Sequence, residues 1–215
     1  MNVISVRQVS KQFRGNQIFE GLSFDIEEGK TYALVGPNGS GKSVLLKLIC
    51  GFETPDEGEI IIDPRYLNGK RTFPDSFGVT INGPAYMPNQ TAVENLAELI
   101  AIRHRVGRAE IYEALDSVGL TANSKQKVRT FSQGMKQKLS LAQALIENPD
   151  VLILDEPFNA LDADSVERLK RLLLHLKTQA KTIVFTSHSQ AEVHDLSDYV
   201  FAISNHKVQQ LESDE

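Results

Sequence analysis

The chain has 215 residues, and 23 Lys plus Arg against 28 Asp plus Glu give it a formal net charge of −5. That balance makes broad nucleic-acid binding a poor expectation, and no stretch approaches the roughly 18 apolar residues of a membrane span. The N-terminus lacks the basic-then-apolar pattern of a signal peptide, and the single cysteine, Cys50, excludes an internal disulfide. We therefore expect a cytoplasmic protein. The length predicts one domain, or one domain with an inserted lobe.

Alternating apolar residues in the first third predict short antiparallel strands in "VISVRQV" and "LSFDIEEGKTYALVG", with Leu22, Phe24 and Ile26 on one face. After Val35 the pattern changes to a glycine-rich loop, followed by an apolar helix over residues 41–50. Further strands are predicted in "EIIID" and "SFGVTI".

The octapeptide "GPNGSGKS", residues 36–43, matches the pattern G-x-x-x-x-G-K-[ST] between a predicted strand and a predicted helix. Its glycines let backbone N–H groups turn toward phosphate oxygens, Lys42 can reach the β- and γ-phosphates, and Ser43 can ligate Mg²⁺. The competing explanation is a plain glycine-rich turn, but the pattern arises by chance in about one chain in a hundred of this length. We therefore predict a bound nucleoside triphosphate and Mg²⁺, with nucleotide-binding residues Gly36, Pro37, Asn38, Gly39, Ser40, Gly41, Lys42, Ser43 and Val44.

The middle of the chain, from about residue 84 to residue 149, has a mostly helical pattern. Thr91 and Glu94 predict a capping box. In "FSQGMKQ", Ser132 is a predicted helix N-cap, because its hydroxyl can accept a hydrogen bond from a first-turn N–H group. Gly134 costs that helix roughly 1 kcal/mol relative to alanine. We interpret this glycine as room for an anion at the positive end of the helix.

The last third alternates strands and helices, and polar residues follow two of its apolar strands. Asp155 and Glu156 end "VLILDE", at the strand end where ligands bind in open α/β sheets. Asp155 suits the Mg²⁺ shell, directly or through water, and Glu156 can orient or deprotonate an attacking water. A lone histidine is more often structural, but His188 follows "TIVFTS" at the same predicted sheet edge, and we expect it to contact a γ-phosphate. The alternation predicts an α/β fold whose mostly parallel sheet has helices on both faces.

Taken in order, Phe13, "GPNGSGKS", a helical insertion, "FSQGMKQ", "VLILDEP", "NALD" and "TSH" resemble the nucleotide-binding domain of ABC transporters over nearly the whole chain. The resemblance implies a P-loop NTPase core, an N-terminal antiparallel β-subdomain and an inserted α-helical subdomain. It places the first two in residues 1–83 and 150–215, and the helical subdomain in residues 84–149.

The resemblance also implies roles for residues. Phe13 stacks on the adenine, Ser132 and Gly134 form the signature motif that meets the γ-phosphate bound to a second copy, residues 159–162 cross between protomers, and His188 is the switch histidine. The predicted catalytic residues are therefore Glu156, His188 and Lys42, and the predicted metal ligands are Ser43, Asn82 and Asp155.

One position departs from the family's pattern. The loop that joins the sheet to the helical subdomain usually carries glutamine, sometimes glutamate, where this chain has Asn82. Asparagine keeps an amide oxygen for Mg²⁺ or water but is one methylene shorter. We therefore still expect ATP hydrolysis, whereas this position leaves open the geometry that couples hydrolysis to transport.

The leading hypothesis is an ATPase subunit that pairs with a second copy or a close homologue around two ATP molecules. It would power export through a separately encoded membrane permease that holds it at the inner face of the cell membrane. The sequence looks most like ATPases of bacitracin-type, lantibiotic-type and drug-efflux exporters. The competing hypotheses are a non-transport ABC ATPase and an ATP-binding interaction module with little hydrolysis. For the permease we predict docking at Tyr86, Met87 and Pro88, beside a hinge at residues 83–84.

Overall fold

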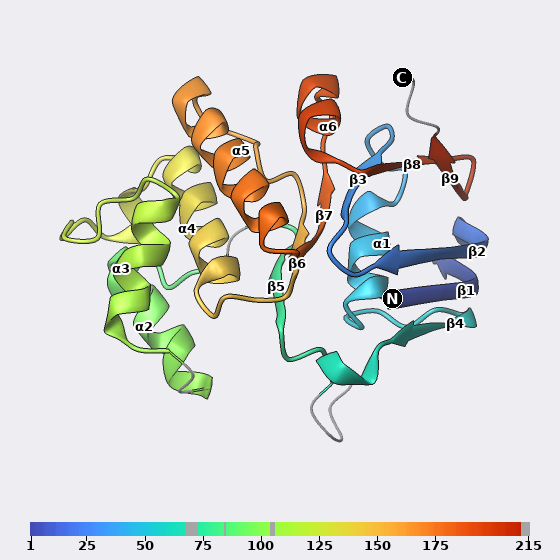
Figure 1. The fold of residues 1–215 in the computed structure, drawn as a ribbon, viewed down its shortest axis with the longest axis horizontal. Coiled ribbons are helices and arrows are strands. Elements are labelled where there is room, and N and C mark those ends of the chain that lie inside the picture. Colours follow the sequence, from blue (N-terminus) through green and yellow to red (C-terminus); the bar gives the residue numbers. More distant parts are fainter. Residues whose placement is uncertain (68–72, 84, 104–105, 212–215) are drawn as a thin grey trace.

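The computed structural model describes residues 1–67, 73–83, 85–103 and 106–211, and Figure 1 shows their arrangement. The strands are β1 (Asn2–Phe13), β2 (Asn16–Glu27), β3 (Thr31–Val35), β4 (Glu57–Ile62), β5 (Phe77–Thr80), β6 (Val151–Leu154), β7 (Thr182–Thr186), β8 (Tyr199–Ser204) and β9 (Lys207–Leu211). The α-helices are α1 (Lys42–Ile49), α2 (Ala92–Arg103), α3 (Arg108–Ser117), α4 (Gln133–Leu145), α5 (Ala163–Thr178) and α6 (Gln190–Leu196), with short 3₁₀ turns at Pro64–Tyr66 and Val128–Thr130.

The N-terminal strands form an antiparallel sheet in the order β2-β1-β4. Leu22 and Ile26 are buried and Phe24 is half-buried, as the alternation predicts. The prediction of short strands was wrong, because β1 and β2 are 12 residues each. Register shifts interrupt their pairing, and Gln8 lies in the left-handed region at one of them, with φ of 50°. Such bulges break the strict alternation on which a prediction of strand length depends.

A second, six-stranded sheet has the order β5-β6-β7-β3-β8-β9. Its first five strands are parallel, and β9 returns antiparallel to β8. β8 and β9 form a hairpin, and its turn residues Asn205 and His206 both have positive φ, 47° and 62°, which suits a two-residue hairpin turn. β3 therefore pairs with distant strands and not with the N-terminal sheet that precedes it.

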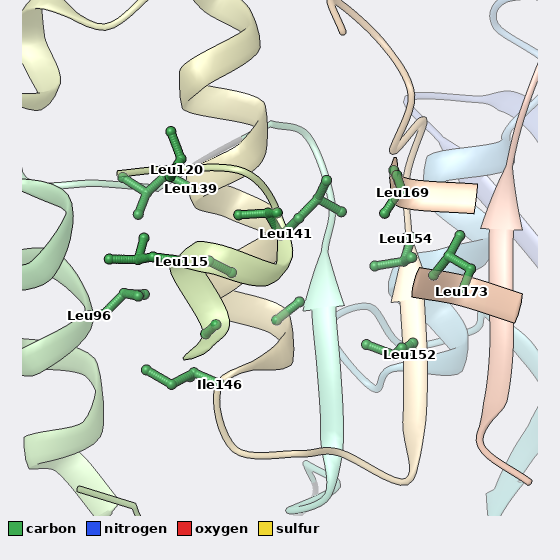
Figure 2. Close-up of a cluster of buried hydrophobic side chains, with 14 of the residues drawn as sticks. Leu96, Leu115, Leu120, Leu139, Leu141, Ile146, Leu152, Leu154, Leu169 and Leu173 are labelled. Carbon is green, nitrogen blue, oxygen red and sulfur yellow. The ribbon is translucent and has the colours of Figure 1, made fainter. Parts of the chain in front are cut away.

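The apolar side chains gather in two cores. One lies under the N-terminal sheet and around α1, and it includes Cys50, which is fully buried. The other joins the helical part to the opposite side of the sheet, and Figure 2 shows its leucines, which come from α2, α3, α4, β6, α5 and the segment after α3. In the described part of the chain, no helix has both the length and the hydropathy that a membrane crossing needs.

The fold class is confirmed: a mostly parallel sheet with helices, an antiparallel N-terminal sheet and a helical insertion between β5 and β6. In Figure 1 the helices α2, α3 and α4 form a lobe on one side of β5, and α1 and the N-terminal sheet lie on the other. The division at residues 83/84 and 149/150 stays a prediction, and Pro84 of the predicted hinge lies outside the described residues.

Candidate functional site

The glycine-rich loop, residues 36–43, runs from the carboxyl end of β3 into the first turn of α1. Gly39 and Gly41 lie in the left-handed region, with φ of 81° and 102°. A Cβ on Gly41 would stand 2.7 Å from the Phe19 ring, and one on Gly36 would stand 2.6 Å from the carbonyl oxygen of Ile203. Glycine is therefore required both by the backbone conformation and by close neighbours.

Two polar side chains in this loop fit a phosphate. Lys42 is only 7% exposed, and its Nζ donates to the carbonyl oxygens of Gly36 (2.9 Å) and Pro37 (3.2 Å). No carboxylate among the described residues pairs with this ammonium group, so its charge is available to an anion. The Ser40 hydroxyl is buried and has no hydrogen-bond partner among the described residues. A buried unpaired hydroxyl is costly unless a ligand or water satisfies it.

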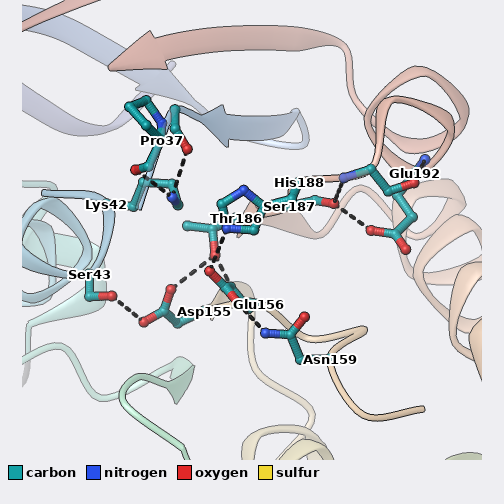
Figure 3. A network of polar contacts seen from close by, with 12 residues as sticks. Pro37, Lys42, Ser43, Asp155, Glu156, Asn159, Thr186, Ser187, His188 and Glu192 are labelled. Atoms are coloured by element: carbon teal, nitrogen blue, oxygen red, sulfur yellow. Dashed lines mark hydrogen bonds and ion pairs between the residues drawn. The ribbon is translucent and has the colours of Figure 1, made fainter. Parts of the chain in front are cut away.

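Asp155 follows β6 and lies opposite the start of α1 (Figure 3). The Ser43 hydroxyl donates to its Oδ2 (2.6 Å), and the Thr186 hydroxyl donates to its Oδ1 (2.9 Å). Both contacts follow from the topology, since β6 pairs with β7 and the loop after β3 meets the same sheet edge. Ser43 and Asp155 supply hard oxygen donors of the kind that Mg²⁺ takes. No group of three or more His, Cys, Asp and Glu residues that could hold a metal occurs in the described ranges, so phosphate and water oxygens would complete such a shell.

Glu156 and His188 are brought together as the sequence predicts. The Nε2 atom of His188 lies 2.9 Å from Oε1 of Glu156, and the Asn159 amide donates to Oε2 of the same carboxylate (Figure 3). Glu156 has φ of 48°, an uncommon value for a residue other than glycine. This turn directs the side chain away from the end of β6 and toward the loop after β7. The site thus combines a carboxylate and an imidazole within reach of the phosphate loop.

The first turn of α4 matches the predicted cap. The Ser132 hydroxyl accepts from the backbone N–H of Met135 (3.1 Å), and Ser132 is exposed. The structure adds a reason for Gly134 that the sequence does not show. A Cβ there would stand 2.6 Å from the carbonyl oxygen of Ala160. The glycine therefore serves internal packing, whether or not an anion approaches the helix.

The loop after Glu156 is held at both ends. Near its start, the Gln137 amide of α4 donates to the carbonyl oxygens of Glu156 (3.3 Å) and Pro157 (3.1 Å). At its other end Asp162 caps α5, accepting from the Ser165 backbone N–H (2.8 Å). Hydrogen bonds from the Ser165 hydroxyl and N–H hold the pKa of Asp162 below its usual value.

Comparison with known proteins places this arrangement in a family. The family profile described as "ABC transporter" matches residues 19–159. The uncharacterized ABC transporter ATP-binding protein YybJ of Bacillus subtilis is 35% identical over 98% of this chain and 96% of its own length. The chain belongs to the ABC transporter family. It is an ATPase subunit that binds and hydrolyses ATP.

Two further ABC transporter relatives bear on transport. The lantibiotic transport ATP-binding protein SrtF of Streptococcus pyogenes is 33% identical over 96% of this chain and 89% of its own length. The sulfate/thiosulfate import ATP-binding protein CysA of Synechococcus elongatus is 36% identical over 98% of this chain and 62% of its own length. Among solved structures, a dimeric bacterial ABC transporter cassette superposes with a TM-score of 0.88 at 25% identity and covers 99% of both chains.

Two predicted ABC transporter site residues lie apart from the phosphate-loop network. Phe13 ends β1 and is 38% exposed, with Nζ of Lys11 4.9 Å from its ring centroid. Asn82 is exposed after β5 and has φ of 62°. Asparagine adopts this left-handed conformation more readily than glutamine does, which accounts locally for the departure from the family's pattern.

Sequence reasoning missed two members of the site. Thr186 was read only as part of "TSH", and Gln137 only as part of a helix. The continuous burial expected for β7 could have marked Thr186, because a hydroxyl residue at the end of a buried strand needs a polar partner. No local signal marks Gln137, since its partners lie about twenty residues away along the chain.

Proposed function

We propose that two copies of this chain, or this chain and a close homologue, form a head-to-tail dimer with two ATP molecules between them. In each site the glycine-rich loop and Lys42 bind the phosphates, and Ser132 and Gly134 of the other copy meet the γ-phosphate. Ser43 and Asp155 would hold Mg²⁺, Asn82 is a further proposed ligand, and bound Mg²⁺ would offset phosphate charge.

The observation that carries this proposal is the position of the α4 N-terminus. It is exposed, capped by Ser132 and positive in potential. In Figure 1, α4 and α1 lie on opposite sides of β5 and β6, so the anion that α4 can meet is not the one bound by its own phosphate loop. A head-to-tail pair supplies each copy's helix with the other's phosphate.

For hydrolysis, we propose Glu156 as the base that orients or deprotonates the attacking water. His188 lies against the same carboxylate and can contact the γ-phosphate from the end of β7. The phosphate loop and Lys42 stabilise negative charge on the transferred group. Asn159 fixes the second carboxylate oxygen of Glu156 and so its orientation.

We propose that a membrane permease receives the energy and that transport is outward. The lantibiotic transport relative supports a role in transport, and the likeness of "YMPNQTAVENL" and "FSQGMKQKLSLAQAL" to exporter ATPases supports the outward direction. Reconstitution with the permease decides the direction: ATP added on the ATPase side should move substrate away from that side. Movement toward the ATPase side would establish import instead.

Tyr86 and Met87, both predicted to dock the permease, differ in their exposure. Tyr86 is half-buried against the helical core, with Nζ of Lys136 5.5 Å from its ring centroid. Met87 is 47% exposed, while its backbone is fixed by hydrogen bonds with Asn95. Tyr86 thus contributes to the lobe's own packing, and Met87 remains a surface candidate.

A second candidate docking surface lies around β5. A cavity of about 580 Å³ between the core and the helical lobe is lined by Phe52, Phe73 and Ile102, which are 50%, 48% and 76% exposed. The rings of Phe52 and Phe73 contact each other with centroids 5.6 Å apart. Since this cavity also borders β5, which leads to Asn82, we propose that a cytoplasmic segment of the permease binds here. Phe73→Asp should release the subunit from permease-containing membranes, whereas Leu174→Asp, at an exposed site on α5, should not.

The dimer is tested with Glu156→Gln. The amide cannot accept a proton from water, so hydrolysis should fall by about 100-fold or more while ATP stays bound. Light scattering with saturating ATP and Mg²⁺ should then report twice the mass seen without nucleotide. A protein that remains monomeric under these conditions would contradict the dimer.

A further inference from the structure

The hydroxyl of Thr186 links the two carboxylate residues of the site. Thr186 is the last residue of β7 and is fully buried. Its Oγ1 donates to Oδ1 of Asp155 (2.9 Å) and accepts from the backbone N–H of Glu156 (2.7 Å). A threonine hydroxyl can donate one hydrogen bond and accept others, so donation to Asp155 and acceptance from Glu156 are compatible.

The conformation of Glu156 gives this contact its importance. With φ of 48° the residue occupies the left-handed region, which is strained for a residue other than glycine. Such a conformation persists only where the surroundings hold it. Its N–H is held by Thr186, and its carbonyl oxygen is held by Gln137. The turn that directs the carboxylate to His188 is thus fixed from β7 on one side and from α4 on the other.

We propose that Thr186 is a positioning residue for ATP hydrolysis: its hydroxyl holds the Glu156 turn in place and orients the Asp155 carboxylate. This inference rests on the proposed roles of Glu156 and Asp155. Thr186 itself does not touch the reacting atoms. Without the hydroxyl, the Glu156 N–H and one Asp155 oxygen would lose their partner, and the turn could relax toward ordinary φ values.

The experiment compares Thr186→Val with a matched control on the same strand. Thr182 is also buried, and its hydroxyl also accepts from a backbone N–H, that of Gly29 (2.9 Å). It stands at the opposite end of β7 from the site. Thr182→Val therefore reports the cost of losing a buried hydroxyl on this strand without disturbing the catalytic loop. Thr186→Ser keeps the hydroxyl and tests for rescue.

The measurements are kcat, the ATP Kd in EDTA and the melting temperature of each variant. Because small misplacements of a catalytic group cost up to about 100-fold in rate, Thr186→Val should lower kcat by about 10- to 100-fold. Its ATP Kd in EDTA should stay within about threefold of wild type, because the loss is of transition-state stabilisation and not of nucleotide binding. Thr186→Ser should recover most of the turnover, and Thr182→Val should keep all of it.

Two results would overturn the inference. One is wild-type turnover in Thr186→Val while Glu156→Gln is inactive. The other is a Thr186→Val protein that loses ATP binding and melts well below Thr182→Val, since that would show a structural role only. Wild-type turnover in Glu156→Gln would instead refute the proposed catalytic site, so the two failures are distinguishable.

Discussion

Gly134→Ala tests the close packing of the first turn of α4 against the loop that follows Glu156. In an unconstrained helix, alanine would be favoured over glycine by roughly 1 kcal/mol. Here the added Cβ would lie 2.6 Å from the carbonyl oxygen of Ala160, whereas real Cβ contacts essentially never fall below 3.0 Å. The two segments must therefore separate by at least 3.0 − 2.6 = 0.4 Å, and forced overpacking costs about 1–3 kcal/mol. The two terms sum to a net loss of about 0–2 kcal/mol in the free energy of unfolding.

Turnover should fall more clearly than stability in this variant. The displaced loop includes Asn159, which holds the Glu156 carboxylate, and a misplaced catalytic group can lose up to about 100-fold in rate. Urea unfolding and steady-state ATPase assays on the same preparation measure both effects. Gln133→Ala is the control, because it places a methyl group in the same turn at an exposed position. If Gly134→Ala gained about 1 kcal/mol of stability and kept wild-type turnover, the packing argument would be refuted.

Further variants test the remaining parts of the site. Lys42→Ala should weaken ATP binding by about 10- to 150-fold, the worth of a charge-assisted hydrogen bond, and abolish hydrolysis; wild-type turnover would contradict the assignment of the phosphate site. Ser132→Arg should leave ATP binding by the monomer intact while it lowers hydrolysis and ATP-dependent dimerisation, and unchanged turnover would show that Ser132 is only a helix cap. Asn82→Ala should preserve membrane association and lower turnover or its coupling to transport, and loss of association would assign Asn82 to docking. Burial raises the pKa of the Cys50 thiol, so a thiol reagent at pH 8 should label Cys50 only after denaturation, and rapid labelling of the folded protein would contradict its burial.

The sequence determined the parts of this protein that depend on neighbours along the chain. The glycine-rich loop is recognisable because its φ values and its approach to phosphate need glycine at fixed spacing. Ser132 and the pair Thr91 and Glu94 are recognisable because helix caps join residues three positions apart. The sequence also predicts that Asp155 and His188 lie at the same edge of the sheet, because neighbouring parallel strands end at a common edge.

The tertiary structure alone decided the contacts between distant segments. Gly134 needs its small size because of Ala160, from which the rest of α4, strand β6 and the loop after Glu156 separate it along the chain. Thr186 becomes part of the site through its hydrogen bonds to the end of β6. Pairing between β6 and β7, and packing of α4 on the loop after Glu156, depend on the whole sheet and both cores forming together. No local propensity encodes such a contact, because its partners become neighbours only when the chain has folded.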